Sequence, residues 1–268
     1  TQTPKLPKTL EDTYAWLTLP FLSLVGYVPI PAFRGQSRLR QANSKIINNT
    51  SMQLIFEQIR TGGDRNFGYL LGDRNTTDAV LIDPSYAPAT LVGRAEAQGL
   101  TVSQVLNTHG HPDHTEGNAK AVQLTGATVA AHSDGPIQPT VALRDGDSVP
   151  IGGLTLECCY VPGHASDHLV LFEPSHRLLF TGDLIFVGKV GGTKTDEDAT
   201  TEWASLQRVL DTFPDDSTIW PGHDYGVRPS STLGLERQTN PFLLCQDLNA
   251  FLTLKRDWRT FKKRHGLK

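Results

Sequence analysis

Cysteine is scarce in this chain, with only 3 among 268 residues: Cys158, Cys159 and Cys245. Two of them are adjacent, and neighbouring cysteines rarely bridge each other within a strand, so the pattern excludes a disulfide framework. We therefore expect a protein of a reducing compartment, either the cytoplasm or an organelle lumen.

An excess of charge of one sign is also lacking. Lys and Arg number 25 against 28 Asp and Glu, which leaves a net charge of -3. Such a chain has no electrostatic reason to bind a polyanion, so we expect no nucleic-acid partner. The hydrophobic share of 38% and the charged share of 20% are ordinary for a globular protein, and the length suits one well-packed domain.

Charged residues are absent from residues 14–33. Hydropathy alone would nominate a membrane segment there, but a spanning helix needs about 20 continuous apolar residues. Helical continuity is broken at Pro20, Gly26, Pro29 and Pro31. We expect residues 1–51 to be an apolar N-terminal extension or leader that packs on the domain or on a second copy. Membrane association through residues 14–33 is the alternative, and a homo-oligomer is left open.

From Met52 onward, short apolar strands alternate with helices, which predicts an α/β (α+β) domain over residues 52–268. The predicted strands are 54–56, 67–71, 79–83, 102–107, 128–131, 154–161, 168–172, 177–180 and 217–220. Helices are predicted at 88–98, 116–124 and 200–212, the last with Asp198 as N-cap, and near the C-terminus at 242–264.

What the chain has in abundance is histidine in one place. Residues 108–114 read Thr-His-Gly-His-Pro-Asp-His and follow directly on a predicted strand. Imidazoles at this density need hydrogen-bond partners or a metal once water is excluded. Three more predicted strands end in a ligand type, at His164, Asp183 and His223. Strand ends are where α/β proteins place their chemistry, so these residues predict a metal site.

The spacing divides these ligands between two ions. His109 and His111 lie two residues apart and point the same way in an extended turn, so they can bind one ion together with His164. Asp113 and His114 face the next position, where a second ion would need His223. Asp183 then lies between the ions as a bridging carboxylate. Two cations ~3.5–4 Å apart share a hydroxide that attacks at neutral pH, so no Ser or Cys nucleophile is required.

The motifs THGHPDH, PGH, TGD and PGHDY, in this order, resemble the metallo-β-lactamase superfamily over residues 52 to about 240. The resemblance implies a four-layer αββα sandwich, here with an N-terminal extension and C-terminal helices. It implies His109, His111 and His164 at one metal and Asp113, His114 and His223 at the other. Asp183 matches the bridge, and Asp113 and Asp183 are the catalytic carboxylates. Two Zn(II) per chain are expected, with Fe or Mn as alternatives.

Within the superfamily, the segments FGYLLGD, AVLIDP, GDLIF and GHDY are most similar to glyoxalase II, the hydroxyacylglutathione hydrolase. This implies hydrolysis of a small-molecule thioester such as a glutathione conjugate. Tyr225 matches a glutathione-contacting tyrosine of that family. The family's longer C-terminal helical region and its lysine and tyrosine after the GD-LF segment are not reproduced. Lys189 and Lys194 are the candidates to replace the missing cation.

Three other functions compete with this interpretation. Persulfide dioxygenases share the fold and use one Fe(II) held by two His and one Asp, which His109 or His111 could form with His164 and Asp183. Lactonase or another ester or amide hydrolase activity is a further alternative. A non-catalytic scaffold would be expected to lack ligands, and this chain has them all. His168, at the start of a strand, is expected to pack rather than to bind metal.

Overall fold

The computed structural model describes residues 54–266. The predictions for residues 1–51, including membrane association through 14–33, lie outside these residues and stay predictions. Among residues 54–266, no helix is both long and apolar enough to cross a membrane.

The first of two large sheets is built from the first half of the described chain. Its strands are β1 (Leu54–Gly62), β2 (Asn66–Asp73), β3 (Asp78–Ile82), β4 (Thr101–Leu106), β5 (Thr128–His132) and β6 (Val141–Leu143), in that spatial order. The β1–β2–β3 meander is antiparallel, whereas β3 to β6 run parallel to one another. All of β2 is buried, because this strand is covered on both faces.

The second half forms the other large sheet. Its members, in spatial order, are β14 (Ser231–Thr232), β13 (Thr218–Pro221), β10 (Leu178–Gly182), β9 (Leu169–Glu173), β8 (Leu154–Tyr160) and β7 (Ser148–Ile151). Within this second sheet, β10 and β13 run parallel and the other neighbouring pairs are antiparallel. The short strands β11 (Ile185–Phe186) and β12 (Lys189–Val190) pair with each other.

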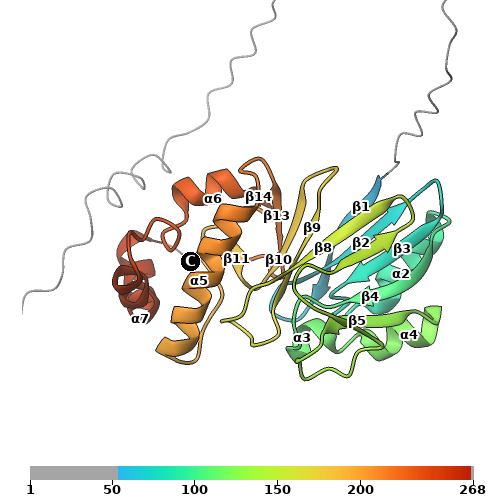
Figure 1. Cartoon of the computed structure of the whole chain (residues 1–268), viewed down its shortest axis with the longest axis horizontal. Helices are drawn as coiled ribbons and strands as arrows, with labels where there is room; N and C mark the ends of the chain where they lie inside the picture. Colours follow the sequence, from blue (N-terminus) through green and yellow to red (C-terminus); the bar gives the residue numbers. More distant parts are fainter. Residues whose placement is uncertain (1–53, 267–268) are drawn as a thin grey trace, which may run out of the picture. The chain divides into compact units, whose positions relative to one another are not determined.

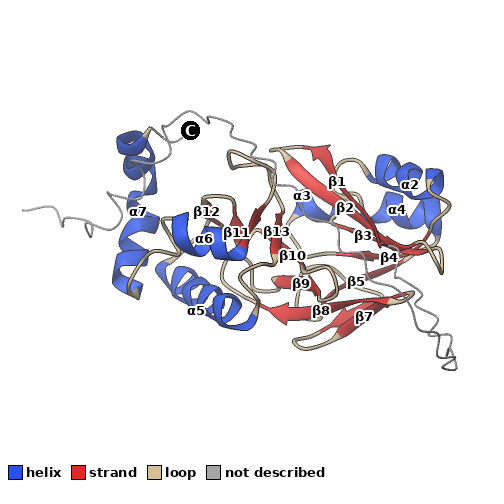
Figure 2. Ribbon diagram, turned by 90° about the horizontal axis from the view of Figure 1, so that it is seen from above, coloured by secondary structure: helices blue, strands red, loops and turns tan. Residues whose placement is uncertain are grey.

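Helices cover the outer faces of the two sheets, as Figures 1 and 2 show. On the first sheet these are α2 (Pro88–Ala97) and α4 (Asn118–Thr125), and on the second α5 (Asp196–Thr212) and α6 (Leu233–Thr239). The short helix α3 (Pro112–Thr115) follows the loop after β4, and α7 (Leu248–His265) packs on α5. Side chains of α2 and α4, among them Leu91 and Ala121, share a buried cluster with the outer face of the first sheet. On the second sheet, Phe172 packs against Phe213 at the end of α5, with ring centroids 4.9 Å apart. The four-layer αββα sandwich is therefore confirmed.

The main core lies between the sheets. Alternate residues of β2, β3 and β4 meet those of β7 to β10 in one buried cluster. Tyr69 and Phe180 contact edge to face across this interface with centroids 5.1 Å apart, and Phe56 packs on Trp220 at 4.6 Å. Each such buried side chain contributes roughly 1.5–3 kcal/mol, so this interface holds the two halves together.

Some element boundaries differ from the sequence expectations. Residues 112–115 form the short helix α3, so α4 begins at Asn118 instead of Glu116. Thr195 caps α5, and Asp198 is the third residue of the same capping box, because its carboxylate accepts from the Thr195 backbone amide. Residues 242–247 are not helical, and the last helix starts at Leu248 after the N-cap Asp247.

Candidate metal centre

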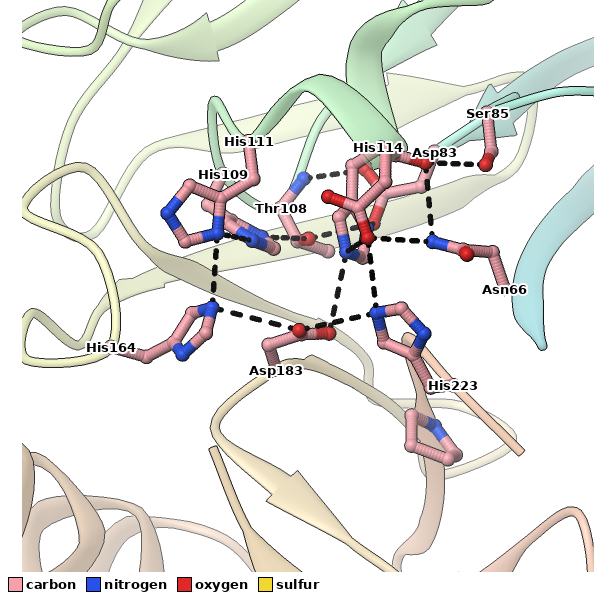
Figure 3. A network of polar contacts seen from close by, with 12 residues as sticks. Asn66, Asp83, Ser85, Thr108, His109, His111, His114, His164, Asp183 and His223 are labelled. Atoms are coloured by element: carbon pink, nitrogen blue, oxygen red, sulfur yellow. Dashed lines mark hydrogen bonds and ion pairs between the residues drawn. The ribbon is translucent and has the colours of Figure 1, made fainter. Parts of the chain in front are cut away.

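The predicted ligands converge on one place, and Figure 3 shows His109, His111, His114, His164, Asp183 and His223 turned toward one another. Asp113 belongs to the same place through its proximity to His114 and His223. The loop after β4 and helix α3 supply His109, His111, Asp113 and His114 from the first half. Three loops of the second half, after β8, β10 and β13, supply His164, Asp183 and His223. The carboxyl ends of β4, β10 and β13 therefore meet, as the strand-end argument predicted.

Three imidazoles form the first ligand group. Nε2 of His109 lies 2.9 Å from Nδ1 of His111, and Nε2 of His164 lies 3.1 Å from the same atom. One ring nitrogen carries at most one proton, so a single Nδ1 cannot donate to both neighbours at once. His111 has extended backbone dihedrals at the start of α3, which turn its ring toward His109. Three converging nitrogen lone pairs suit a cation.

The second ligand group is Asp113, His114 and His223, whose ligand atoms lie within 4.8 Å of one another. Nε2 of His223 lies 3.3 Å from Oδ2 of Asp113, and Nε2 of His114 lies 3.7 Å from that oxygen. Two imidazoles and a carboxylate form a donor set that zinc and iron both accept.

Asp183 lies between the two groups. Its Oδ2 is 3.5 Å from Nε2 of His164 in the first group and 3.3 Å from Nε2 of His223 in the second. Its Oδ1 lies 3.4 Å from Nε2 of His114. One carboxylate therefore touches both groups, which is the arrangement of a bridging ligand.

Two buried polar atoms at the centre have no hydrogen-bond partner, namely Nε2 of His114 and Oδ1 of Asp183. Each unsatisfied buried polar atom lowers the stability of the fold by about 1–3 kcal/mol. Two such atoms side by side therefore indicate that a further group binds between them. The backbone opposite them is Gly222, where a Cβ would collide with the Asp183 carboxylate. A backbone position that must stay free of a side chain, next to two unpartnered donor atoms, fits a metal ion.

Asp83 orients the first half of the site. Its Oδ2 accepts from Nδ1 of His114 at 3.0 Å and from the hydroxyl of Thr108 at 2.6 Å. Because that hydroxyl is used as a donor, it accepts from Nδ1 of His109 at 3.1 Å. Both imidazoles thereby present Nε2 to the centre. Asp83 follows directly on β3 with a φ of 47°, an uncommon angle outside glycine.

Backbone carbonyls orient the other imidazoles. Nδ1 of His164 lies 2.7 Å from the carbonyl oxygen of Gly192, and Nδ1 of His223 lies 2.9 Å from that of Asp64. The Asn66 amide donates to Oδ2 of Asp113 at 3.0 Å. None of these partners was expected from the sequence: the two backbone carbonyls carry no residue signal, and Asn66 stands alone at the start of a strand. Among the orienting groups, only Asp83 has a recognisable signal in the sequence, because it is a single carboxylate directly after an apolar strand.

His168 is a further imidazole beside the site. It is fully buried and stacks on His109 with centroids 4.9 Å apart, and its Nε2 accepts from the backbone amide of Asp183 at 3.0 Å. It belongs to none of the ligand groups among the described residues. Its position supports two ligands from behind, which agrees with packing instead of metal binding.

The sequence comparisons decide the family. The sequence model described as "Metallo-beta-lactamase superfamily" matches residues 61–223. This chain belongs to that superfamily.

Similar proteins in the superfamily carry two kinds of name. A hydroxyacylglutathione hydrolase of Polaromonas sp. is 38% identical over 178 residues, covering 64% of this chain and 67% of the relative. The mitochondrial persulfide dioxygenase ETHE1 of Homo sapiens is 34% identical over 181 residues, covering 66% and 71%. The crystal structure of ETHE1 from Myxococcus xanthus superposes with a TM-score of 0.71 at 31% identity, covering 76% of this chain and 91% of that one. Membership of the superfamily implies metal ions, which agrees with the clusters of His and Asp.

The electrostatics of the site keep the Asp183 carboxylate ionised and shift the pKa values of the imidazoles in opposite directions. Burial alone would raise the pKa of Asp183, but the His114 imidazole beside it holds the pKa well below its usual range. Burial alone would lower the pKa of His114, but the carboxylates of Asp183 and Asp83 raise it. Burial lowers the pKa of His109 well below its usual value, so this ring is neutral near pH 7. A metal entering the site displaces the His114 proton, because only a neutral imidazole ligates.

The predicted substrate residues lie on one flank of this superfamily site. Nζ of Lys189 is 4.0 Å from the ring centroid of Tyr225, and that ring stacks on His223 with centroids 4.7 Å apart. The Tyr225 hydroxyl donates to the Asp64 carboxylate at 2.7 Å. Lys189 and Lys194 line one cavity of about 300 Å³ between the segment after β12 and helix α7, whereas Tyr225 is not part of its wall. Lys189 therefore lies both beside the Tyr225 ring and at the cavity, whereas Lys194 lies only at the cavity.

Proposed function

We propose that this protein is a binuclear metal-dependent hydrolase that cleaves a small-molecule thioester, in the manner of the hydroxyacylglutathione hydrolases. The observation that supports it best is the second ligand group, Asp113 with His114 and His223. Its ligand atoms, like those of the first group, all lie within 4.8 Å of one another, and it shares Asp183 with the first group. A site for one ion would not need this second group. We propose two Zn(II), with Fe or Mn as alternatives.

The residues have separate tasks in this proposal. His109, His111 and His164 hold one ion and Asp113, His114 and His223 the other, with Asp183 shared. When bound, the ions would polarise the thioester carbonyl and lower the pKa of a bound water molecule to about 7. Asp113 stays ionised as a ligand of the second ion, because the hydrogen bond from His223 holds its pKa well below the usual range. It is the more open of the two carboxylates, with 34% of its side chain exposed against 9% for Asp183.

Substrate binding falls to the flank of Lys189 and Tyr225. Burial, with the nearby charge of Lys262 second, lowers the pKa of Lys189, and an anionic group placed beside it would favour its charged form. The cavity next to Lys189 also exposes Lys194 to its occupant. We propose that these cations bind a carboxylate of the thioester substrate, as a glutathione conjugate would offer.

The test combines metal analysis with a substrate panel. The proposal expects about two zinc per chain and hydrolysis of S-lactoylglutathione or another thioester. A preference for lactones in the same panel would move the assignment to a lactonase and leave the two-metal site intact. Full activity in protein that binds no metal would overturn it.

Asp183→Asn tests the shared carboxylate. The variant keeps the shape of the side chain but loses the charge that touches both ligand groups, so we expect thioester hydrolysis to fall by at least about 100-fold with the fold intact. Asp73→Asn is the matched control, because it removes a carboxylate that is equally buried but bonded to Asn75 and Gly153 outside the site. Equal losses in both variants would contradict the assignment.

A mononuclear Fe(II) persulfide dioxygenase is the second candidate. The extensive superposition on the Myxococcus xanthus protein and the similarity to the human enzyme favour it. His109, His164 and Asp183 would provide the two-His, one-carboxylate set that such iron sites use. One iron per chain, with oxygen consumed on addition of glutathione persulfide and no thioester hydrolysis, would establish it over the hydrolase.

A further inference from the structure

A buried ion pair joins the two long helices of the second half. Glu202 of α5 has no exposed side-chain surface and Lys255 of α7 keeps 10%, and their charged groups are in direct contact. The second Glu202 oxygen, Oε1, has no hydrogen-bond partner. Burial raises the pKa of Glu202 to about 7 against the opposing effect of Lys255, which reflects a costly environment for the charge.

Stability alone does not account for such a pair. Removing two charges from water costs several kcal/mol, and apolar replacements of buried ion pairs are often neutral or stabilising. The unsatisfied Oε1 adds to the cost. The location of the pair suggests what it does instead.

The Lys255 ammonium group is also bonded to the loop that orients a metal ligand. Its Nζ donates to the carbonyl oxygen of Gly191 at 2.6 Å. The carbonyl of the next residue, Gly192, is the one that lies 2.7 Å from Nδ1 of His164. A side chain on Gly191 would collide with the His164 ring and the Asp183 backbone, so this loop approaches the ligands as closely as a backbone can.

Glu202 reaches the same ligand from the opposite side. Its backbone packs on Gly163, which has a φ of 139° and where a Cβ would collide with the Glu202 Cα. One turn further along α5, the Ser205 hydroxyl donates to the carbonyl oxygen of Pro162 at 2.7 Å. Helix α5 therefore holds the two residues that precede His164, while Lys255 holds Gly191, the residue before the acceptor of the His164 ring.

We propose that Lys255 and Glu202 are positioning residues for His164, coupling α7 and α5 to one metal ligand through the Gly191–Gly192 backbone. This inference rests on the metal binding in the proposed function. The pair fixes the distance between the loop before His164 and the loop that accepts its Nδ1–H, and so fixes the direction of Nε2. Loss of an outer partner of a ligating histidine weakens metal binding about 10–100-fold.

Zinc titration of the full-length protein tests it, with the affinities of the two ions measured by chelator competition. In Lys255→Met we expect one ion to bind about tenfold more weakly and the other as in the wild type, since only one ion is held by His164. Arg256→Met is the matched control, because it breaks the neighbouring ion pair of α7, to Asp196, which has no bond to the Gly191–Gly192 loop. Wild-type affinity in Lys255→Met, or an equal loss in Arg256→Met, overturns the proposal.

A double variant separates positioning from folding. Lys255→Met alone leaves the Glu202 charge buried and unpaired, which can destabilise the protein by itself. Glu202→Met combined with Lys255→Met removes both charges, so we expect the metal-free protein to recover wild-type thermal stability while the weaker zinc affinity persists. Recovery of both quantities would make the pair purely structural.

The same titration keeps the two proposals distinguishable. A wild-type protein that binds no metal overturns both of them. A wild-type protein that binds one ion contradicts the two-ion hydrolase, and Lys255 is then judged by the affinity of that ion, because His164 belongs to the mononuclear set as well. Two ions with normal affinity in Lys255→Met refute the positioning role alone.

Discussion

At the scale of single residues, the ligand types of this site are visible in the sequence and their orienting partners are not. His109, His111 and His164 stand out because histidines gather at predicted strand ends. The carbonyls of Gly192 and Asp64, which orient His164 and His223, belong to the backbone and leave no trace in residue identity. Residue patterns predict which atoms can bind a metal, whereas the direction of each ring depends on loops whose paths only the fold defines.

His168 provides a residue-scale prediction. In His168→Leu the amide of Asp183 loses its buried acceptor, so we expect the metal-free protein to lose ~1–3 kcal/mol of unfolding free energy. His168→Gln carries an oxygen near the position of Nε2 and should recover most of that loss. Urea unfolding in the presence of a chelator measures both variants. Equal destabilisation by Leu and Gln would show that ring packing on His109, and not the hydrogen bond, is what matters.

At the scale of elements, the sequence predicted the long strands and helices and missed the short ones. Strands such as β4 and β8 have clear apolar patterns, whereas β11, β12 and β14 are two residues each, too short for any period. Helix α3 has four residues and exists because His111 and Pro112 start a turn that places Asp113 and His114. Of the elements that sequence patterns miss, α3, β11 and β12 lie next to the site, whereas β6, β7 and β14 are edge strands of the two large sheets.

Asp73 links two elements from different sheets, and its titration gives a second prediction. At the end of β2, its carboxylate accepts from the amides of Gly153, before β8, at 2.8 Å and of Asn75 at 2.9 Å. Burial alone would raise the pKa of Asp73, but these bonds lower it below its usual value. A carboxyl group whose folded pKa is below the unfolded value of about 3.9 stabilises the protein above that pH, and loses this effect as the pH falls through the folded pKa.

Asp73→Asn should therefore destabilise the protein by ~1–2 kcal/mol at pH 7 and by clearly less near pH 3. Denaturant unfolding of both proteins across this range measures the difference. A constant difference from pH 7 to pH 3 would show that the amide replaces the carboxylate fully and that the charge contributes nothing.

At the scale of the whole molecule, the site lies where the two halves of the described chain meet. Each half forms one of the two large sheets and supplies some of the ligands. The cluster of residues 109–114 comes from the first half, and His164, Asp183 and His223 come from the second (Figure 3). The order of motifs along the chain predicted this division, because the ligands of each ion are split between distant segments. Metal binding should consequently stabilise the contact between the halves as well as the loops.

Metal removal tests this junction. A ligand that binds only the folded state, at a free concentration of 100 times its Kd, adds about 2.7 kcal/mol to the unfolding free energy per site. For a domain of this size, that corresponds to a rise in Tm of roughly 5–10 °C per ion. We expect scanning calorimetry to show this rise when zinc is added to chelator-treated protein. Asp183→Asn should show a much smaller rise, because its carboxylate touches both ligand groups. An unchanged Tm on zinc addition to the wild type would mean that the halves meet without a metal between them.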